Sequence, residues 1–573
     1  MMSTHDTRAV LSRTRLRGPV VGKVLAVLAV ALLLFLIANP ILRIVITSLQ
    51  DPADGGFVLE NYAIAFGSVR SLRAFANSIL YGLGVTALAI VVASPMAWAV
   101  SRTDMPCKGL VRGLVLGAFI TPSYLGAVGW ILLAGPNAGW LNQMWVSLTG
   151  SSAGLFNIFG FTGLIFVTTL YSFPYIFVFA SDALDLLSSE MEDAANILGA
   201  GTLRTSLKVT LPLIVPAISA GAIITFLDTI ALFGTPAIIA LPARINVMTL
   251  QLWQFFEFPV RVEAAAAYSI PLIAITCMLF GLQRLVLGRR GYVALTGKTS
   301  QRRLVVTGRW RWVLLGYCLL ICAFAVFLPF AALGQAAFST AWGKGLSWAN
   351  FTLGNFAYVL FEHPSSAQTI VNTLLYAAAA ATLAVALGLT IAYLLNRKLV
   401  PFGGVLAMLA MTPFVIPGIV LAVGFYIAYT SPPLSLYGTA AMLVLAYTAR
   451  FLPVAFANSV AALRSINPEM EEAVRILGGS RVTALTKVLG PLLKKSLAGS
   501  WILVLIPAMR ELSTAIFLVS PNTRVLSVML LDLSEDGNFE AMAALGVILL
   551  VTTVLIVAIS NRLLGRDIIL KRS

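Results

Sequence analysis

The chain has 573 residues, of which 59% are hydrophobic and only 11% are charged, and its mean hydropathy is +0.93. These values exclude a soluble globular or disordered protein and indicate a polytopic membrane protein. The net charge is +16. Most of the basic residues lie between apolar segments, which favours a role in membrane topology over nucleic-acid binding.

Apolar runs of about 20 residues, long enough to cross a hydrocarbon core of roughly 30 Å, predict twelve membrane-spanning helices. The predicted spans are 24–48, 75–101, 112–134, 161–182, 211–240, 262–284, 312–334, 369–395, 402–430, 436–462, 492–519 and 540–561. The fifth and eleventh are too long for one straight crossing, and Pro216, Pro236 and Pro507 predict kinks or breaks in them. The first has no A-x-A-like cleavage site after it, so we expect an uncleaved helix.

An orientation follows from the basic residues. With the N-terminus inside and twelve spans, most Lys and Arg residues fall in cytoplasmic loops and tails, as the positive-inside rule requires. The exceptions, on the outer side or within spans, include Arg70, Arg73, Arg244, Lys344, Arg450, Arg510 and Arg524. The sequence therefore predicts that both termini are cytoplasmic.

One polar segment occurs twice. Glu190 to Gly199 reads EMEDAANILG and Glu469 to Gly478 reads EMEEAVRILG, with identity at seven of ten positions. In each copy a Pro follows the Gly by thirteen residues. At an offset of 295, segment 76–80 also aligns with 371–375, Arg102 with Arg397, 119–122 with 414–417, and Gly129 with Gly424. Six spans per half is an even number, so the halves form a parallel repeat.

This repeat predicts the organisation of the chain. It comprises a cytoplasmic N-terminal tail (1–23), a first six-span half (24–284) with a polar loop at 183–210, a basic cytoplasmic linker (285–311), a second six-span half (312–561) with a polar loop at 463–491, and a cytoplasmic C-terminal tail (562–573).

Each polar loop is predicted to contain a short amphipathic helix. Asn467 and Pro468 fit an N-cap and a first-turn proline, and acidic residues follow near the helix N-terminus. Apolar residues at three- and four-residue spacing share one face: Met191, Ala194 and Leu198 in the first copy, and Met470, Ala473 and Leu477 in the second. Gly199 and Gly478 permit a sharp turn. The alternative is an ordinary internal loop that was duplicated with its half.

Residues for catalysis or metal binding are scarce. His5 and His363 are too scattered for a metal site, and the four cysteines contain no C-x-x-C pair. Lys298 and Thr299 resemble the end of a phosphate-binding loop, but the preceding Gly291 is one residue too far away and no strand signal precedes it. We therefore expect no catalytic or metal-ligating residues and no nucleotide bound by this chain.

Ionisable residues inside spans are costly and usually face a cavity or a partner. The candidates are Asp228, Arg450, Arg510 and Glu511. Two interpretations stay open: these residues line a translocation path, or they pair with one another to join helices.

The repeated segment resembles the cytoplasmic loop of binding-protein-dependent ABC importer permeases, whose pattern is E-A-A followed by spaced Gly and Pro. The first copy reads Asp193-Ala194-Ala195, Gly199 and Pro212, and the second reads Glu472-Ala473-Val474, Gly478 and Pro491. Asp193 and Val474 are mild departures. The resemblance covers nearly the whole chain, and two such halves in one polypeptide most resemble ferric-iron permeases and their relatives for phosphonates, thiamine and polyamines.

The resemblance implies an all-α permease of the type I importer class, in the bacterial inner membrane, that is not itself an enzyme. It implies two cytoplasmic ATPase subunits, which bind ATP in place of any cofactor on this chain, and a periplasmic solute-binding protein. The implied coupling residues are Glu190, Met191, Asp193, Ala194, Ala195, Leu198, Gly199, Glu469, Met470, Glu472, Ala473, Leu477 and Gly478.

Ferric iron is the first expectation for the solute, and Arg450 and Arg510 keep an anionic solute such as a phosphonate or sugar phosphate as the alternative. A secondary, ion-coupled transporter is the alternative from another class, because twelve spans in two parallel halves describe such carriers as well.

Overall fold

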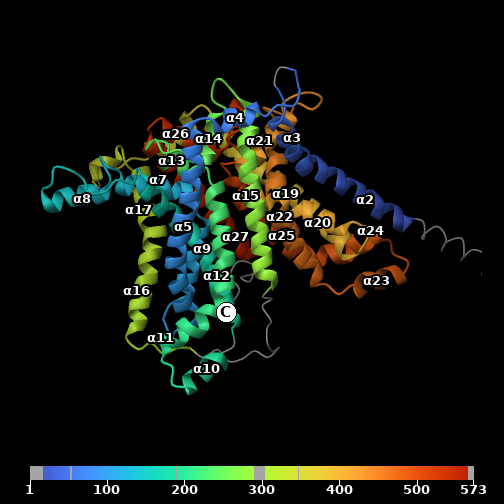
Figure 1. Cartoon of the computed structure of the whole chain (residues 1–573), viewed down its shortest axis with the longest axis horizontal. Helices are drawn as coiled ribbons and strands as arrows, with labels where there is room; N and C mark the ends of the chain where they lie inside the picture. The colour runs from blue at the N-terminus through green and yellow to red at the C-terminus, as the bar shows by residue number, and fades with distance from the viewer. Residues whose placement is uncertain (1–16, 52–53, 188–189, 290–303, 346, 565–573) are drawn as a thin grey trace, which may run out of the picture. The chain divides into compact units, whose positions relative to one another are not determined.

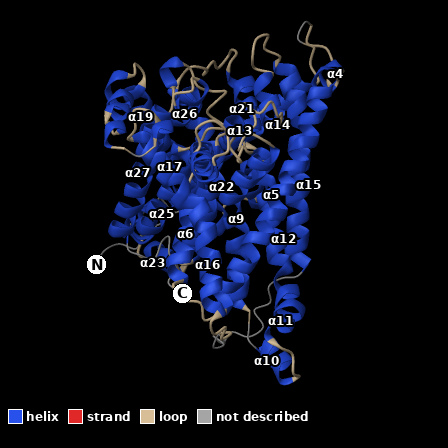
Figure 2. Cartoon of the chain, turned by 90° about the vertical axis from the view of Figure 1, so that its left-hand side faces the viewer, coloured by secondary structure: helices blue, strands red, loops and turns tan. Residues whose placement is uncertain are grey.

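The computed structural model describes residues 17–51, 54–187, 190–289, 304–345 and 347–564. Figure 2 shows helices joined by loops, and pairing between extended segments in this part of the chain is limited to three isolated bridges. Ten helices are long and apolar enough to cross a membrane, or up to twelve if each of two bent helix pairs counts as one span. The predicted all-α polytopic class is confirmed.

The two bent pairs correct the predicted third and ninth spans. Helices α6 (Lys108–Ile120) and α7 (Ser123–Ala134) meet at 98°, and α20 (Gly403–Val415) and α21 (Gly418–Tyr429) meet at 111°. A proline disfavours helical geometry in the residue before it, and Pro122 and Pro417 stand immediately before α7 and α21. The predicted spans 112–134 and 402–430 are therefore each divided into two helices by a sharp bend that the sequence analysis did not anticipate.

The predicted breaks in the fifth and eleventh spans are confirmed. Helix α12 (Leu211–Ala231) ends well before residue 240, and a separate short helix, α13 (Gly234–Ile239), follows it. Helix α25 (Gly490–Met509) ends at Met509, ten residues before the end of the predicted span. Pro216 and Pro507 lie inside these helices and Pro236 lies inside α13, so none of the three prolines stands at a break itself.

The chain forms two compact units, and each is described by itself. Unit 1 comprises Met1–Val58, Ser365–Met529 and Leu549–Ser573, and unit 2 comprises Leu59–Pro364 and Leu530–Ile548. Besides α20, α21 and α25, the described helices of unit 1 are α2 (Arg17–Leu33), η1 (Leu34–Ala38), α3 (Asn39–Ser48), α19 (Ser366–Asn396), α22 (Ala440–Arg464), α23 (Glu469–Ile476), α24 (Arg481–Ala484), η7 (Leu485–Leu489) and η8 (Pro521–Thr523).

Unit 2 holds the remaining helices, and two helices cross its boundary. In addition to α6, α7, α12 and α13, its helices are α4 (Glu60–Phe66), α5 (Val69–Arg102), α8 (Trp140–Thr149), α9 (Phe161–Leu186), α10 (Glu190–Ile197), α11 (Thr202–Thr205), η2 (Ser206–Thr210), α14 (Met248–Gln254), α15 (Val262–Arg289), α16 (Trp310–Cys322), η3 (Ala323–Phe327), α17 (Leu328–Ala337), η4 (Trp342–Lys344), η5 (Trp348–Asn350), α18 (Gly354–Ala357) and η6 (Tyr358–Glu362). Helices α26 (Leu526–Glu535) and α27 (Phe539–Leu564) contribute to both units.

Each unit is built on three mutually packed long helices. In unit 2 these are α5, α9 and α12, which lie side by side in Figure 1. In unit 1 they are α19, α22 and α25. The two trios occupy equivalent positions in the sequence repeat, so the duplication extends to the core packing.

The first span of each sequence half packs in the unit built mainly from the other half. In unit 1, α3 packs on α21, and in unit 2, α17 packs on α7. The aligned glycines explain the close approach: a Cβ on Gly424 would lie 2.9 Å from the carbonyl oxygen of Pro40, and a Cβ on Gly129 would lie 2.7 Å from Cβ of Pro329. The compact units therefore divide the chain differently from the halves of the sequence repeat, 24–284 and 312–561.

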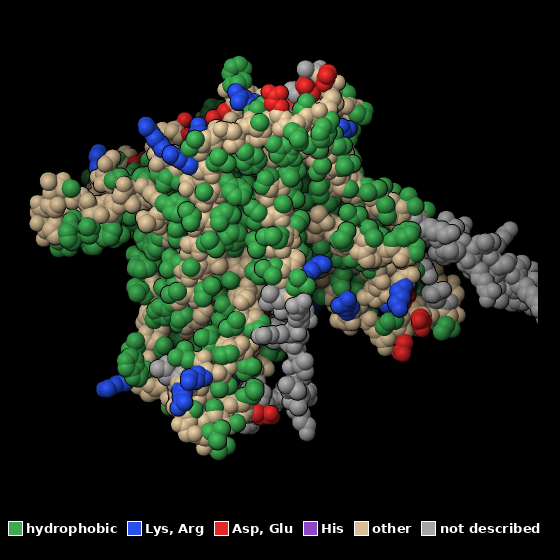
Figure 3. Space-filling view, viewed as in Figure 1, with side chains coloured by type: hydrophobic (Ala, Val, Ile, Leu, Met, Phe, Trp, Pro, Cys, Tyr) green, Lys and Arg blue, Asp and Glu red, His purple; other side chains and the backbone are tan. Residues whose placement is uncertain are grey.

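The surface agrees with a membrane environment. Hydrophobic side chains cover most of the long helices on the face that Figure 3 shows, and Lys, Arg, Asp and Glu side chains gather near helix ends. The predicted tails 1–23 and 562–573 and the linker 285–311 fall largely outside the described residues. The described end of the linker, at 304–307, is considered with the site below.

Candidate functional site

The two copies of the repeated segment form matching short helices. Helices α10 and α23 each contain eight residues, and each carries three acidic residues in its first turn. In the second copy, the side-chain oxygen of Asn467 accepts a hydrogen bond from the backbone N–H of Glu469 at 3.1 Å, as its predicted N-cap position requires.

Both helices are followed by a glycine in the left-handed region. The φ angle is +82° at Gly199 and +83° at Gly478, values that cost a residue with a Cβ about 1–2 kcal/mol. A Cβ at either position would meet no atom within 4 Å. The requirement for glycine is thus conformational rather than steric, and it is the same in both copies.

Each repeated segment carries several apolar side chains that are exposed on the surface of its unit. Met191 is 56% exposed and Met470 is 47% exposed, whereas Leu198 and Leu477 are each 87% exposed. Ala194 and Ala473 are exposed as well. The isoleucines at the helix ends, Ile197 and Ile476, are 86% and 85% exposed and were absent from the predicted apolar face. Exposed apolar side chains gathered in this way indicate a contact surface.

A buried arginine holds the first copy. Arg102, the last residue of α5, has a side chain that is only 2% exposed, and its Nη1 lies 3.6 Å from Oε2 of Glu192. Its Nη2 donates a hydrogen bond to the carbonyl oxygen of Leu187 at 3.0 Å. The hydroxyl of Thr210 donates to Oε1 of Glu192 at 2.6 Å. Glu192 thereby joins α10 to both the core helix α5 and the segment that leads into α12.

The second copy has the equivalent pair at shorter range. Nε of Arg397, the residue after α19, lies 2.7 Å from Oε2 of Glu471. The hydroxyl of Tyr393 donates to Oε1 of the same carboxylate at 2.7 Å. The side chains of Arg397 and Glu471 are 12% and 7% exposed. We call the Arg102–Glu192 and Arg397–Glu471 pairs the two Arg–Glu ties.

The acidic partners in these ties were not predicted from the sequence. The predicted coupling residues include Glu190, Asp193, Glu469 and Glu472 but neither Glu192 nor Glu471. A signal was present, because both glutamates are identical in the two copies and the alignment of Arg102 with Arg397 was recognised. The alignment alone did not connect the arginines with the glutamates, which are separated from them by 90 and 74 residues.

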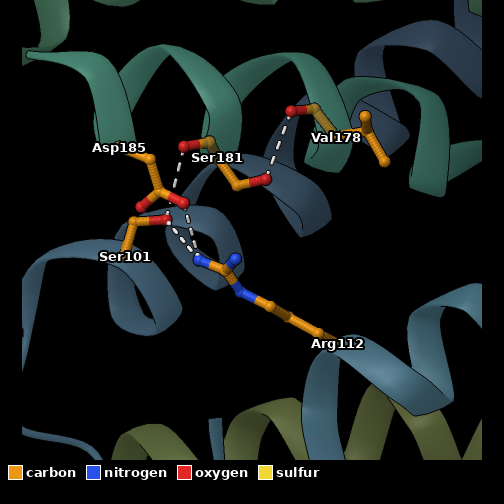
Figure 4. A network of polar contacts seen from close by, with 5 residues as sticks. All are labelled: Ser101, Arg112, Val178, Ser181 and Asp185. Carbon is orange, nitrogen blue, oxygen red and sulfur yellow. Dashed lines mark hydrogen bonds and ion pairs between the residues drawn. The ribbon is translucent and has the colours of Figure 1, made fainter. Parts of the chain in front are cut away.

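A second polar network braces the same end of unit 2, as Figure 4 shows. Nη2 of Arg112 in α6 lies 2.9 Å from Oδ2 of Asp185 in the last turn of α9, and 3.5 Å from the hydroxyl of Ser101 in α5. The Ser101 hydroxyl in turn donates to the carbonyl oxygen of Ser181 at 3.5 Å. Three helices of the unit are joined just before α10 begins.

The described end of the linker is tied to this region too. The backbone N–H of Val305 donates to the carbonyl oxygen of Arg102 at 2.8 Å. Oδ1 of Asp104 accepts hydrogen bonds from the backbone N–H and the hydroxyl of Thr307, at 2.8 and 2.6 Å. The hydrogen bonds from Thr307 lower the pKa of the Asp104 carboxyl.

Two of the four predicted intramembrane charges lie beside the bend between α20 and α21. Nη1 of Arg450 donates to the carbonyl oxygens of Pro413 and Ile416, at 3.2 and 2.8 Å. Oε1 of Glu511 accepts from the backbone N–H and the hydroxyl of Thr514, at 2.9 and 3.1 Å. Both carboxylate and guanidinium approach Gly418, where a Cβ would lie 3.3 and 3.4 Å from them.

These contacts explain how the end of α20 is stabilised at the bend. A helix end leaves carbonyl groups without partners, and Arg450 supplies donors to two of them.

The other two predicted intramembrane charges belong to different units. Asp228 lies in α12 and Arg510 just beyond α25, and both are half-buried. Among the described residues, no group of three or more His, Cys, Asp or Glu side chains is placed to hold a metal ion.

Comparison with known proteins identifies the chain. The model of the "Binding-protein-dependent transport system inner membrane component" family matches residues 87–291 and 384–569, more than half of the sequence. The chain belongs to this family. It is thus a multi-pass permease of the inner membrane with two permease domains, and it serves transport rather than catalysis. Each match includes one copy of the repeated segment.

Named relatives align over most of the chain. The "Ferric transport system permease protein FbpB" of Actinobacillus pleuropneumoniae is 25% identical over 95% of this chain and 78% of its own length. A putative ferric transport permease of Haemophilus influenzae is 25% identical over 87% of this chain and 78% of its own length. A putative 2-aminoethylphosphonate permease of Salmonella paratyphi A is 27% identical over 42% of this chain and 89% of its own length.

Proposed function

We propose that this permease imports ferric iron, with a periplasmic binding protein delivering the solute and two cytoplasmic ATPase subunits driving transport. In this proposal α10 and α23, with the glycines that follow them, each dock one ATPase subunit. The coupling residues are Glu190, Met191, Asp193, Ala194, Ala195, Leu198 and Gly199 in the first copy, and Glu469, Met470, Glu472, Ala473, Leu477 and Gly478 in the second. Ile197, Ile476, Glu192 and Glu471 join this set.

The docking assignment rests on one observation: each repeated segment combines exposed apolar side chains with an Arg–Glu tie. Its apolar side chains are exposed by about half or more, while one glutamate is held on a buried or nearly buried arginine of a core helix. A helix held in this way can pass a displacement of its docked partner to the core trio of its unit. Two such helices in one chain fit two ATPase subunits.

The topology supports placing both docking helices in the cytoplasm. With the N- and C-termini inside, most Lys and Arg residues lie in cytoplasmic segments. The loops with α10 and α23 then share the side of the membrane on which an ATPase has access to ATP. The chain itself needs no cofactor in this scheme, because the ATP is bound by the partner subunits.

Ferric iron is favoured as solute because two relatives named for ferric transport align with both halves of the chain. The phosphonate relative aligns with less than half of it. An anionic solute such as a phosphonate or sugar phosphate is the second candidate within the same importer class, followed by thiamine and polyamines. Family membership favours the importer over a secondary transporter.

We place Asp228, Arg450, Arg510 and Glu511 on the translocation path. Their half-buried side chains near helix breaks support this, because irregular backbone at membrane depth normally lines a cavity. For Arg450 and Glu511 the hydrogen bonds beside Gly418 indicate that they also shape the path by fixing the bend.

The docking assignment can be tested by purification of the complex. The tagged permease, purified gently from its native membrane, is expected to retain two ATPase copies per chain. I197S/L198S and I476S/L477S should each remove one copy, and their combination should remove both and abolish uptake. L148S, which changes a 77% exposed leucine on α8, is the matched control. Full ATPase retention in the combined variant would contradict the docking role.

The solute is tested separately, in proteoliposomes with the complete complex. ATP-dependent uptake of radioactive ferric iron from its binding protein should exceed uptake of 2-aminoethylphosphonate. Uptake driven by an ion gradient without any ATPase would instead establish a secondary transporter. ATP-dependent phosphonate uptake without iron uptake would keep the importer and reject the iron assignment.

A further inference from the structure

A basic pocket lies at the end of unit 2 remote from α10. It has a volume of about 560 Å³ and is lined by Val69, Arg70, Arg73, Asn77, Leu241, Arg244 and Asn246. Arg70 and Arg73 belong to the first turns of α5, whose last residue is Arg102 of the first Arg–Glu tie. A helix of 34 residues is about 50 Å long, so the pocket and the tie are separated by that distance.

The three arginines of this pocket have no acidic partner in the described chain. Their side chains are exposed, and no ion pair or side-chain hydrogen bond of Arg70, Arg73 or Arg244 occurs among the described residues. Arg70 and Arg73 also stand at a helix N-terminus, where the macrodipole is positive and cations are disfavoured. Three like charges and a helix end of the same sign repel one another unless an anion joins them.

The second half of the chain shows that the fold does not require these arginines. In unit 2, the side-chain amide of Asn77 donates to the carbonyl oxygen of Asn246 at 2.8 Å, and the backbone N–H of Met248 donates to the Ser78 hydroxyl at 2.7 Å. In unit 1, the equivalent bonds join Asn372 to Arg524 at 3.1 Å and Leu526 to Thr373 at 2.8 Å.

The same loop is therefore built twice, but its charges differ. At an offset of 295, Arg70 and Arg73 correspond to Ser365 and Gln368. At the offset of 278 that relates Asn246 to Arg524 and Met248 to Leu526, Arg244 corresponds to Asn522. Only Arg524 introduces a cation into the second copy, where the first has Asn246. The arginines of the first copy are also exceptions to the predicted charge distribution across the membrane. Arginines on the outer side of the membrane depart from the positive-inside rule, and their grouping around one pocket therefore points to a ligand rather than to packing.

We propose that this pocket binds a small soluble anion that carries two or more carboxylate or phosphate groups. Its volume lies in the range of small-molecule sites, roughly 300–1,000 Å³. Guanidinium groups bind carboxylate and phosphate oxygens through paired hydrogen bonds. Three of them around one recess favour a multivalent anion over a single carboxylate. The site is separate from the docking helices and does not depend on the identity of the transported solute.

The test measures citrate and pyrophosphate binding to the full-length permease in nanodiscs of phosphatidylcholine, by titration calorimetry. Wild type is expected to bind at least one of them, with affinity that falls as salt rises. R70S/R244N, which installs the residues of the second half, should weaken binding at least tenfold. R261Q/K344Q removes two exposed cations elsewhere in unit 2 and should change affinity less than twofold. Unchanged thermal unfolding of R70S/R244N verifies that the fold is intact.

Four outcomes would overturn the proposal. Equal affinity in wild type and R70S/R244N would remove the pocket from consideration. Equal losses in R70S/R244N and R261Q/K344Q would indicate a diffuse electrostatic field. Loss of binding in phosphatidylglycerol nanodiscs would assign the pocket to a lipid headgroup. Absence of binding for both probes, with arginine-dependent binding of the solute-binding protein, would assign it to carboxylates of that partner.

Discussion

The two Arg–Glu ties occupy equivalent positions in the repeat and are held differently. In the first, the Arg102 and Glu192 side chains lie 3.6 Å apart, and the second carboxylate oxygen is bound by Thr210 from the segment after α10. In the second, Arg397 approaches Glu471 to 2.7 Å, and the additional hydroxyl belongs to Tyr393 on the core helix α19. The second carboxylate is thus bound entirely by the α19 end, and the first is shared between two segments.

The first copy has further support that the second lacks. Arg112 and Asp185 join α6 to α9, whereas the residues at the equivalent positions, Ala407 and Arg464, cannot form that pair. The two copies share some features of the tie and differ in others. An arginine at the end of the first core helix and a glutamate on the short helix are kept, while the groups around them vary. Under the proposed function, we therefore expect the shared pair to be the element most directly required for coupling.

The largest effect is expected from E471Q. It removes the charge that compensates nearly buried Arg397, and loss of one partner of a buried pair costs about 3 kcal/mol. E192Q should cost less, about 1 kcal/mol: Arg102 is the more buried arginine, but its pair with Glu192 is longer and it keeps its hydrogen bond to the carbonyl of Leu187. Thermal unfolding measures the stability, and the ratio of solute uptake to ATP hydrolysis measures coupling.

The control for this pair of variants is E60Q, which neutralises an exposed glutamate at the start of α4. E471Q should lower the uptake ratio several-fold at a temperature where the protein is folded, and E471D should restore part of it. If E192Q and E471Q reduce stability and coupling equally, the different geometries of the two Arg–Glu pairs do not affect function.

Intermediate and equal effects are expected from G199A and G478A. Both glycines have nearly the same left-handed φ and open space around a built Cβ, so alanine should cost about 1–2 kcal/mol of local strain in either copy. The strain should tilt the docking helix and lower uptake, most strongly in the double variant, while the protein stays in the membrane. G150A provides a glycine control, with φ of +67° and open space at the end of α8. A larger loss of uptake from one glycine would show that the two ATPase contacts contribute unequally.

Much of this site was predictable from the sequence because duplication marks it. The helices, the turn glycines and the N-cap at Asn467 follow from short-range chemistry that acts within a few residues. The apolar face at Met191 and Leu198 follows from helical spacing. The breaks near Ala231 and Met509 were predictable from span length, since a single straight helix over those segments exceeds the membrane thickness.

Two kinds of feature were missed: bends inside spans of ordinary length, and contacts between residues that are distant in the sequence. The bends before Pro122 and Pro417 were missed because span length was normal there, although the duplicated prolines marked both positions. The Glu471 tie joins residues that no local pattern connects. The packing of α17 on α7 was also missed, because hydropathy identifies a span without specifying which neighbour it contacts.

The smallest effects are expected where the two ties differ, at Y393F and T210V. Each variant removes one hydroxyl donor and keeps the arginine. Tyr393 is 3% exposed, so Y393F leaves an oxygen of nearly buried Glu471 without a donor, at a cost of about 1 kcal/mol. Glu192 is 12% exposed, so water can replace the Thr210 donor more readily, and T210V should lower the unfolding temperature less. Tyr62 on α4 is half-buried and belongs to neither tie, so Y62F serves as the tyrosine control. A larger loss of stability and uptake in T210V than in Y393F would mean that the bridge from Glu192 to the segment before α12 carries the first tie. Coupling in the two copies would then run through different core helices despite their common origin.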